Sequence, residues 1–163
     1  MKAYLDNDVV SAIAKDDTAT ESAALDRLLA AKDEGKLDLV TSGITLKEIK
    51  RYKGSNRKPV ERTFRLLNKV PVVEWEELVR IESYGDSRTW INAPVIQNQV
   101  LYDSLLKLGL EPTDVQHLFA AANQGCEIFL TCDGVILAHA DDISQLCKLA
   151  VQKPSHLAAK LPP

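Results

Sequence analysis

Four acidic residues are spaced along the chain so that secondary structure would bring them together. Asp6 and Asp133 each come shortly after an apolar run that is predicted to form a strand. Glu48 and Asp114 fall in the first turns of two predicted helices. In an open α/β sheet, the carboxyl ends of the strands and the starts of the following helices meet at one edge, where such folds place their chemistry. The four carboxylates are therefore expected at the same edge.

Four carboxylates held close together repel one another unless cations neutralise them. Hard divalent ions such as Mg²⁺ or Mn²⁺ prefer oxygen ligands and keep several waters. A metal site of this kind suits phosphodiester hydrolysis, because the metal activates a water for in-line attack and stabilises charge on the phosphate oxygens. The pattern predicts a metal-dependent hydrolase with Asp6, Glu48, Asp114 and Asp133 as catalytic residues and metal ligands.

Three of the four acids also have a simple structural interpretation. Thr45 and Glu48 match a capping box. Asp114 suits a helix cap or the helix dipole, and Asp133, which precedes a glycine, suits a turn. Asp6 is harder to explain in this way, because a carboxylate directly after a buried strand needs a partner or solvent. The case for a site rests on all four acids fitting one edge.

Strand and helix patterns alternate along the chain, which predicts an α/β fold with a central parallel sheet. Pro71 argues that the strand containing it lies at an edge of the sheet. Strands are predicted over residues 2–5, 37–41, 70–73, 127–131 and 149–152. Helices are predicted over residues 21–36, 75–84, 95–108, 114–124 and 143–149, with further helices beginning near 9, 45 and 59, a loop over 85–94, and one or two final turns over 155–160.

Composition indicates an ordinary globular protein. The chain has 163 residues, of which 45% are hydrophobic, so we expect a single domain. Its three cysteines are few and lack the spacing of a metal site, which favours a reduced, cytoplasmic compartment. No secretory signal is visible, and no apolar run approaches the ~20 residues that span a bilayer. We expect no membrane partner.

Basic residues are concentrated between residues 47 and 69. That stretch holds nine Lys or Arg and two Glu, a net charge of +7 in a chain whose total is −3. A basic segment beside Glu48 favours contact with a phosphate backbone, although a solvated helical face or a surface for an acidic partner is the alternative. The residues assigned to nucleic-acid binding are Lys47, Lys50, Arg51, Lys53, Arg57 and Arg62.

Four segments give the chain a family resemblance. They are YLDNDV at residues 4–9, TSGITLKEI at 41–49, DVQHLFAAA at 114–122 and FLTCD at 129–133. In order and approximate spacing they resemble the PIN-domain nucleases, and more specifically the VapC-type toxins of bacteria and archaea. The last two segments are the most specific part of the resemblance.

The resemblance implies a three-layer PIN-like fold and a cluster of acids that binds Mg²⁺ or Mn²⁺. It also implies cleavage of RNA to products with a 5′-phosphate and a 3′-hydroxyl, a cognate antitoxin partner and homodimerisation. Position by position, Asp6, Glu48, Asp114 and Asp133 take the metal-site roles. Thr131, Asn7 and Asp8 are expected as supporting polar residues.

The sequence departs from the family pattern in three places. Many relatives have Thr or Ser at the position of Asn7, and Asn at the position of Asp8. No acidic residue follows Asp133, although one often does in the family. Residues 75–108 match the family poorly, and we expect them to form a specialised helical segment for a lid or a partner.

Two alternative functions stay open at this stage. The strand followed by Asp6-x-Asp8 resembles the start of haloacid-dehalogenase-type phosphatases, in which the first Asp attacks phosphorus. A PIN-like module that binds or scaffolds without catalysis is the second alternative. His117 lies three positions after Asp114 and could share its helix face, but a partly buried structural histidine is a simpler interpretation than a group supporting the site.

Overall fold

The computed structural model describes residues 1–9, 19–45, 70–73, 79–84, 91–96 and 98–162. A five-stranded sheet forms its centre, with strand order β3-β2-β1-β6-β7 and parallel pairing throughout. β3 therefore lies at an edge, as Pro71 predicted. The strands are β1 (Lys2–Leu5), β2 (Asp38–Ser42), β3 (Val72–Val73), β6 (Ile128–Leu130) and β7 (Ala150–Gln152).

Alternating side chains of the central strands fill two separate cores. In β1, Ala3 and Leu5 face one core, whereas Tyr4 faces the other. The neighbouring strand β6 alternates in the same way, with Phe129 beside Tyr4 in the register. The two aromatic rings stack with centroids 5.3 Å apart. Because strand side chains alternate between faces, a sheet buried on both sides needs apolar residues at nearly every position.

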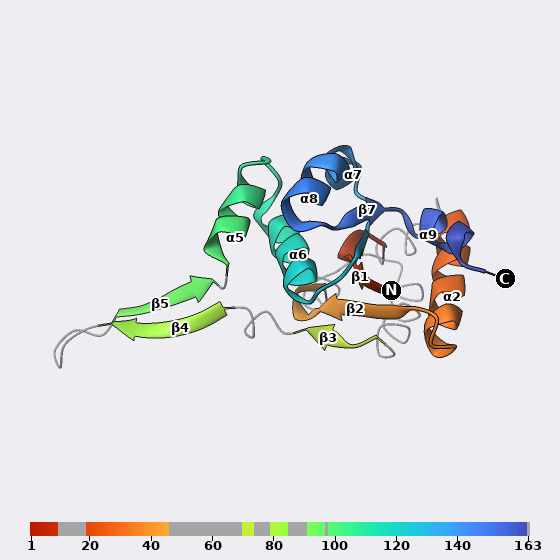
Figure 1. Ribbon diagram of the computed structural model, residues 1–163, viewed down its shortest axis with the longest axis horizontal. Coiled ribbons are helices and arrows are strands. Elements are labelled where there is room, and N and C mark those ends of the chain that lie inside the picture. The colour runs from red at the N-terminus through yellow and green to blue at the C-terminus, as the bar shows by residue number, and fades with distance from the viewer. Residues whose placement is uncertain (10–18, 46–69, 74–78, 85–90, 97, 163) are drawn as a thin grey trace, which may run out of the picture.

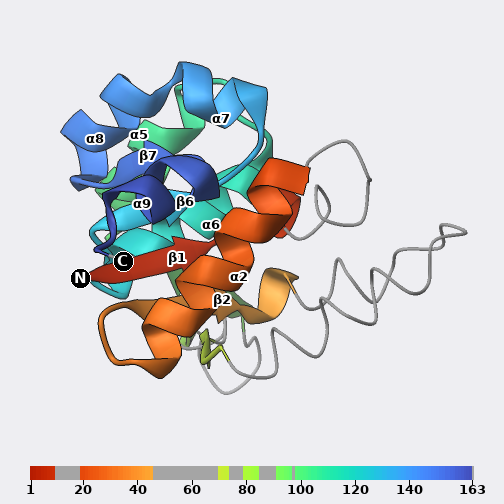
Figure 2. The same cartoon turned by 90° about the vertical axis from the view of Figure 1, so that its right-hand side faces the viewer.

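Helices cover both faces of the sheet and make a three-layer α/β fold. α2 (Ala19–Asp33) and α9 (Pro154–Lys160) pack on the face that holds Ala3 and Leu5. The other face carries α5 (Gln99–Leu106), α6 (Pro112–Asn123), α7 (Gly134–Ala138) and α8 (Ala140–Cys147). Figure 1 shows α2 and α9 together at one side of the molecule and α5 to α8 at the other. Figure 2 shows β1 and β2 beside α2.

A β-hairpin replaces the first half of the helical segment that was predicted around residues 75–108, and only its last part is helical. β4 (Val79–Tyr84) pairs antiparallel with β5 (Ile91–Ile96), and the ribbon extends away from the main sheet (Figure 1). The helix predicted over 75–84 is wrong from residue 79 onwards, and the loop predicted over 85–94 is wrong from residue 91. Val79 and Ile81 are β-branched residues at alternate positions, a strand signal that outweighs the helix-forming Glu and Leu around it.

The remaining differences concern single elements. The helix predicted over 95–108 begins only at Gln99, because residues 95 and 96 belong to β5. α7 was not predicted, and the helix predicted over 143–149 begins earlier, at Ala140, and ends at Cys147. Residues 10–18 and 46–69, where three further helices were predicted to begin or run, lie outside the described residues. Across the part of the chain that the structure describes, we find no helix with the length and apolarity to cross a membrane.

Candidate functional site

The carboxyl edge of the sheet brings together three of the four predicted acids. Asp6 follows β1 and Asp133 follows β6, and these strands are neighbours with Leu5 opposite Leu130. Asp114 lies in the first turn of α6. The charges of Asp6 and Asp133 both act on Asp114 strongly enough to raise its pKa. Glu48 and the six basic residues assigned to nucleic-acid binding lie outside the described residues.

Asp6 is the most buried acid of this edge, with 4% of its surface exposed. Its Oδ1 accepts a hydrogen bond from the backbone N–H of Asn7 at 2.7 Å, and its Oδ2 accepts one from the hydroxyl of Thr131 at 2.8 Å. Burial raises the pKa of Asp6, while nearby His117 and the Thr131 hydrogen bond lower it. A carboxylate has about four lone-pair directions, so some remain for an outside ligand.

Thr131 joins Asp6 to Asp133. Its hydroxyl donates to Asp6 and accepts from the backbone N–H of Asp133 at 3.0 Å. Asp133 is the N-cap of α7, since its Oδ1 accepts from the N–H groups of Val135 at 2.6 Å and Ile136 at 3.0 Å. Asp133 therefore has a structural role, in line with the simple interpretation of its sequence, and its Oδ2 makes no hydrogen bond within the described residues.

Asp114 differs from the other two acids, because its carboxylate forms no hydrogen bond or ion pair among the described residues. It is half-buried, and Glu111 rather than Asp114 occupies the N-cap position of α6. Burial and then the charges of Asp6 and Asp133 raise its pKa from 3.8 to about 6. A half-buried carboxylate placed beside other acids, with no partner among the described residues, is a candidate for a functional group.

Asn7 and Asp8 complete the described part of this edge. The side-chain Oδ1 of Asn7 is buried and has no hydrogen-bond partner among the residues that the structure describes. A buried oxygen without a donor is uncommon in folded proteins and needs an explanation. The charge of Asp8 contributes to raising the pKa values of both Asp6 and Asp114. Asp8 therefore adds to the negative potential of the edge.

The donor set fits a hydrated Mg²⁺ or Mn²⁺. Among the described residues, no three His, Cys, Asp or Glu side chains converge closely enough to bind one metal ion directly. Mg²⁺ does not require such a cluster, because it keeps several waters and is commonly held through one or two carboxylates. The unpartnered Oδ1 of Asn7 is an acceptor suited to one of those waters. Oxygen donors with unneutralised charge are the chemistry that these ions prefer.

Sequence reasoning missed the polar residues that lie behind the acids. Tyr4 and Ser42 are fully buried, and the Tyr4 hydroxyl lies between Ser42 Oγ and Nδ1 of His117. His117 was expected to be a partly buried structural histidine, and it is instead fully buried, with 1% of its surface exposed. Its Nε2 lies 3.9 Å from Oδ1 of Asp6. The sequence did offer one signal for these residues. A tyrosine and a serine occur in strands whose two faces are both expected to be buried, where apolar residues are the rule.

The fold belongs to the PIN-like α/β class, with a parallel sheet between two layers of helices. Solved structures with the same arrangement include the VapBC2 complex of Rickettsia felis bound to a DNA fragment from its promoter, with a TM-score of 0.56 and 10% identity over 94% of this chain and 98% of that one. Another is PAE2754 from Pyrobaculum aerophilum, with a TM-score of 0.52 and 14% identity over 98% of this chain and 94% of that one. No protein-family model matches the sequence, and the search of curated proteins returned no match.

Proposed function

We propose that this protein is a divalent-metal-dependent endoribonuclease and the toxin of a toxin–antitoxin pair. The observation that carries the proposal is the acidic edge of the sheet, where no described Lys or Arg pairs with Asp6, Asp114 or Asp133. Asp114 has a pKa raised to about 6 by burial and by Asp6 and Asp133, and it has no partner of its own among the described residues. Strongly perturbed carboxylates at the carboxyl edge of an α/β sheet are characteristic of active sites.

Each acid has a different role in the proposed site. Asp6 is oriented on both oxygens by Asn7 and Thr131, so its free lone pairs have a fixed direction. Asp114 supplies an uncommitted carboxylate, and Asp133 is held through its other oxygen by the start of α7. A bound Mg²⁺ or Mn²⁺ supplies water activation and neutralises charge on the phosphate. Glu48 is proposed as the fourth acid of the same site.

A nucleic acid is the substrate that the charge distribution favours, and we propose RNA because the resemblance to the PIN-domain nucleases implies it. The stretch from residue 47 to 69 carries a net charge of +7 and includes Glu48, so cationic side chains adjoin an acidic residue of the site in the sequence. Basic side chains neutralise and align a phosphate backbone without reading its bases. In the proposal, Lys47, Lys50, Arg51, Lys53, Arg57 and Arg62 hold the strand while the acids act on one phosphodiester.

An antitoxin partner and a homodimer are also proposed. One structural neighbour is a VapBC2 complex crystallised with DNA from its promoter. That likeness is one of fold, and it supports looking for a small protein partner of this chain. Co-expression with a candidate antitoxin, followed by size-exclusion chromatography, measures whether a complex forms.

A haloacid-dehalogenase-type phosphatase is less well supported. That mechanism needs Asp6 as an exposed nucleophile, whereas Asp6 is buried and both of its oxygens accept hydrogen bonds. The phosphatase mechanism also assigns no role to Asp114, whose pKa is raised. Formation of an aspartyl phosphate on Asp6 would revive this alternative.

The decisive experiment measures cleavage of a labelled single-stranded RNA by the purified protein. One sample contains excess Mn²⁺ and the other contains a chelator. We expect cleavage with Mn²⁺ only. Asp6→Asn and Asp114→Asn should each lower the rate by about 100-fold or more, since losing several kcal/mol of charge stabilisation has that effect. The matched control is Asp141→Asn, a substitution of the same kind at an exposed acid of α8.

The outcome that contradicts a nuclease is also defined. If wild type cleaves no faster than Asp6→Asn and Asp114→Asn, the proposal fails and a non-catalytic PIN-like module remains. Equal loss in Asp141→Asn would show that the effect is not specific to the acidic edge. Circular dichroism of each variant establishes that the fold is intact.

A further inference from the structure

A row of buried polar side chains leads from the interior of the molecule to Asp6. Oη of Tyr4 lies 2.6 Å from Oγ of Ser42 and 2.7 Å from Nδ1 of His117. On the other side of the imidazole ring, Nε2 lies 3.9 Å from Oδ1 of Asp6. Tyr4 lies in β1, Ser42 in β2 and His117 in α6, and Asp6 directly follows β1. The row therefore connects three elements. Each of them is at most 4% exposed.

This row occupies positions where the fold otherwise uses apolar residues. Tyr4 packs within the core between the sheet and α5 to α8, and its ring stacks on Phe129. Burying polar groups costs free energy unless they are hydrogen-bonded. Phenylalanine at position 4 would fill the same space at a lower polar cost. The hydroxyl of Tyr4 is therefore best explained by what it does to its neighbour, His117.

The distribution of protons in the row determines what His117 presents to Asp6. Burial raises the pKa of Tyr4, so its hydroxyl keeps its proton. Tyr4 has one proton to donate, either to Oγ of Ser42 or to Nδ1 of His117. When it goes to Nδ1, Ser42 is the donor to Oη, and Nε2 of His117 carries the ring proton and faces Asp6 with an N–H. In the other neutral tautomer, the Nε2 lone pair would face a carboxylate oxygen 3.9 Å away, which is electrostatically unfavourable. A doubly protonated ring also presents an N–H to Asp6.

We infer that His117 is a positioning residue, held through Nδ1 by Tyr4, whose Nε2–H faces Asp6 and fixes that carboxylate for a divalent cation. The inference rests on the proposed function, because it assigns His117 a role in the same site. At 3.9 Å the contact with Asp6 is electrostatic rather than a direct hydrogen bond. Together with Thr131 on Oδ2, it restrains both oxygens of Asp6. Groups that orient metal ligands in this way commonly change metal affinity by about 10–100-fold when removed.

The first measurement concerns the metal-free protein and needs no RNA. In ¹⁵N-histidine-labelled protein at pH 8, two-bond ¹H–¹⁵N correlations show which ring nitrogen carries the proton, and the signals that vanish in His117→Gln assign the ring. We expect protonated Nε2 in the wild type. Tyr4→Phe should yield a mixture of tautomers, because it removes the partner of Nδ1. Tyr102→Phe, the same substitution on α5, should leave the wild-type pattern.

The second measurement is Mn²⁺ affinity by calorimetry. Tyr4→Phe should weaken binding by about 10-fold, with Tyr102→Phe unchanged. His117→Gln places an amide N–H near the position of Nε2 and should keep more affinity than His117→Leu. This partial rescue separates a positioning role from simple core packing, because leucine fills the core at least as well. Thermal melts identify any variant that fails to fold.

The results separate this inference from the nuclease proposal. An unprotonated Nε2 in the wild type overturns the inference, as does equal Mn²⁺ affinity in Tyr4→Phe and Tyr102→Phe. Should Tyr4→Phe fail to fold, Ser42→Ala tests the same row from its far end, with a smaller change expected in the same direction. Retained tautomer and Mn²⁺ effects without RNA cleavage would support the role of His117 and overturn the nuclease proposal.

Discussion

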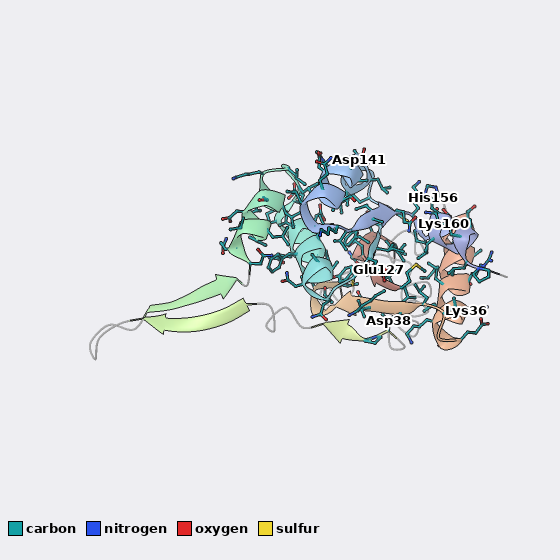
Figure 3. The ribbon with its side chains drawn as sticks, in the orientation of Figure 1. Lys36, Asp38, Glu127, Asp141, His156 and Lys160 are labelled. Atoms are coloured by element: carbon teal, nitrogen blue, oxygen red, sulfur yellow. The ribbon has the colours of Figure 1, made fainter. Side chains whose placement is uncertain are left out.

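The two ends of the same parallel sheet differ in whether their charged groups have partners of opposite charge. At the amino edge, charges are matched: Glu127 pairs with the N-terminal ammonium at 3.7 Å and accepts from the backbone N–H of Lys2 at 3.1 Å. Lys36 pairs with Glu34 at 3.0 Å. Figure 3 labels Lys36, Asp38 and Glu127, which mark this edge. The three acids of the carboxyl edge have no Lys or Arg partner among the described residues.

At the carboxyl edge, neither Asp6, Asp114 nor Asp133 forms an ion pair with a Lys or Arg of the described residues. Burial and then the charges of Asp6 and Asp133 instead raise the pKa of Asp114. At the amino edge the N-terminal ammonium and Lys36 have acidic partners, whereas at the carboxyl edge no described Lys or Arg pairs with these acids. Three measurements can sharpen or break this comparison.

The largest expected effect is stabilisation by Mn²⁺. A ligand that binds only the folded state at 100 times its Kd adds about 2.7 kcal/mol, which for a chain of this size raises Tm by about 5–10 °C. Asp114→Asn should lose most of this increase, because it removes a carboxylate of the carboxyl edge. Glu127→Gln should keep it fully. Differential scanning fluorimetry with Mn²⁺ and with chelator gives the answer, and an equal response in both variants would break the comparison.

A smaller effect is expected when the metal is absent. Asp114 has a folded-state pKa of about 6, above its ordinary value of 3.8. The unfolded chain therefore ionises this group more easily, so ionisation destabilises the fold above pH 6, and the penalty fades as pH falls from 6 towards 4. Asp114→Asn should raise Tm by about 1–3 °C at pH 7.5, a modest figure because the group is half-exposed.

The control for this effect is the pH dependence itself. At pH 4.5 the Tm difference between Asp114→Asn and the wild type should be much smaller. A variant that is less stable than the wild type at pH 7.5 in the presence of chelator would show that Asp114 has a stabilising partner. In that case the carboxyl edge would resemble the amino edge after all.

The smallest effect is expected at the amino edge. Glu127 is 66% exposed on its side chain, and exposed ion pairs contribute at most about 1 kcal/mol. Glu127→Gln keeps an acceptor for the Lys2 N–H, so Tm should change by less than about 2 °C. The change should be the same with and without Mn²⁺. A large loss of stability would mean that the amino edge also depends on charge.

The main sheet was predictable because its strands carry strong local signals. β1 and β6 are short apolar runs that end near acids, and each is separated from its neighbour by a helical pattern. The edge position of β3 followed from Pro71, which cannot donate a backbone hydrogen bond. The position of three acids at one edge followed from topology, since parallel strands end on the same side.

The hairpin and the buried polar row were not predictable to the same degree. Residues 79–84 contain Glu and Arg between their apolar residues, so their local pattern also fits a helix, and only pairing with Ile91–Ile96 decides the matter. Tyr4 and Ser42 are separated by 38 positions, and their contact depends on the register of β1 with β2. Such contacts arise from tertiary structure, which single-segment patterns do not contain.

The capping bonds of Asp133 bear on how the sequence would change in a relative that no longer uses the acidic edge. Asp133 begins α7, so drift at this position would unravel a helix start and would be removed by selection for folding alone. Asp114 gives the fold no bond among the described residues, and its ionisation opposes folding at neutral pH. A descendant without activity would therefore lose Asp114 early and keep Asp133. The presence of Asp114 in a sequence of this fold is thus the better marker of a working site.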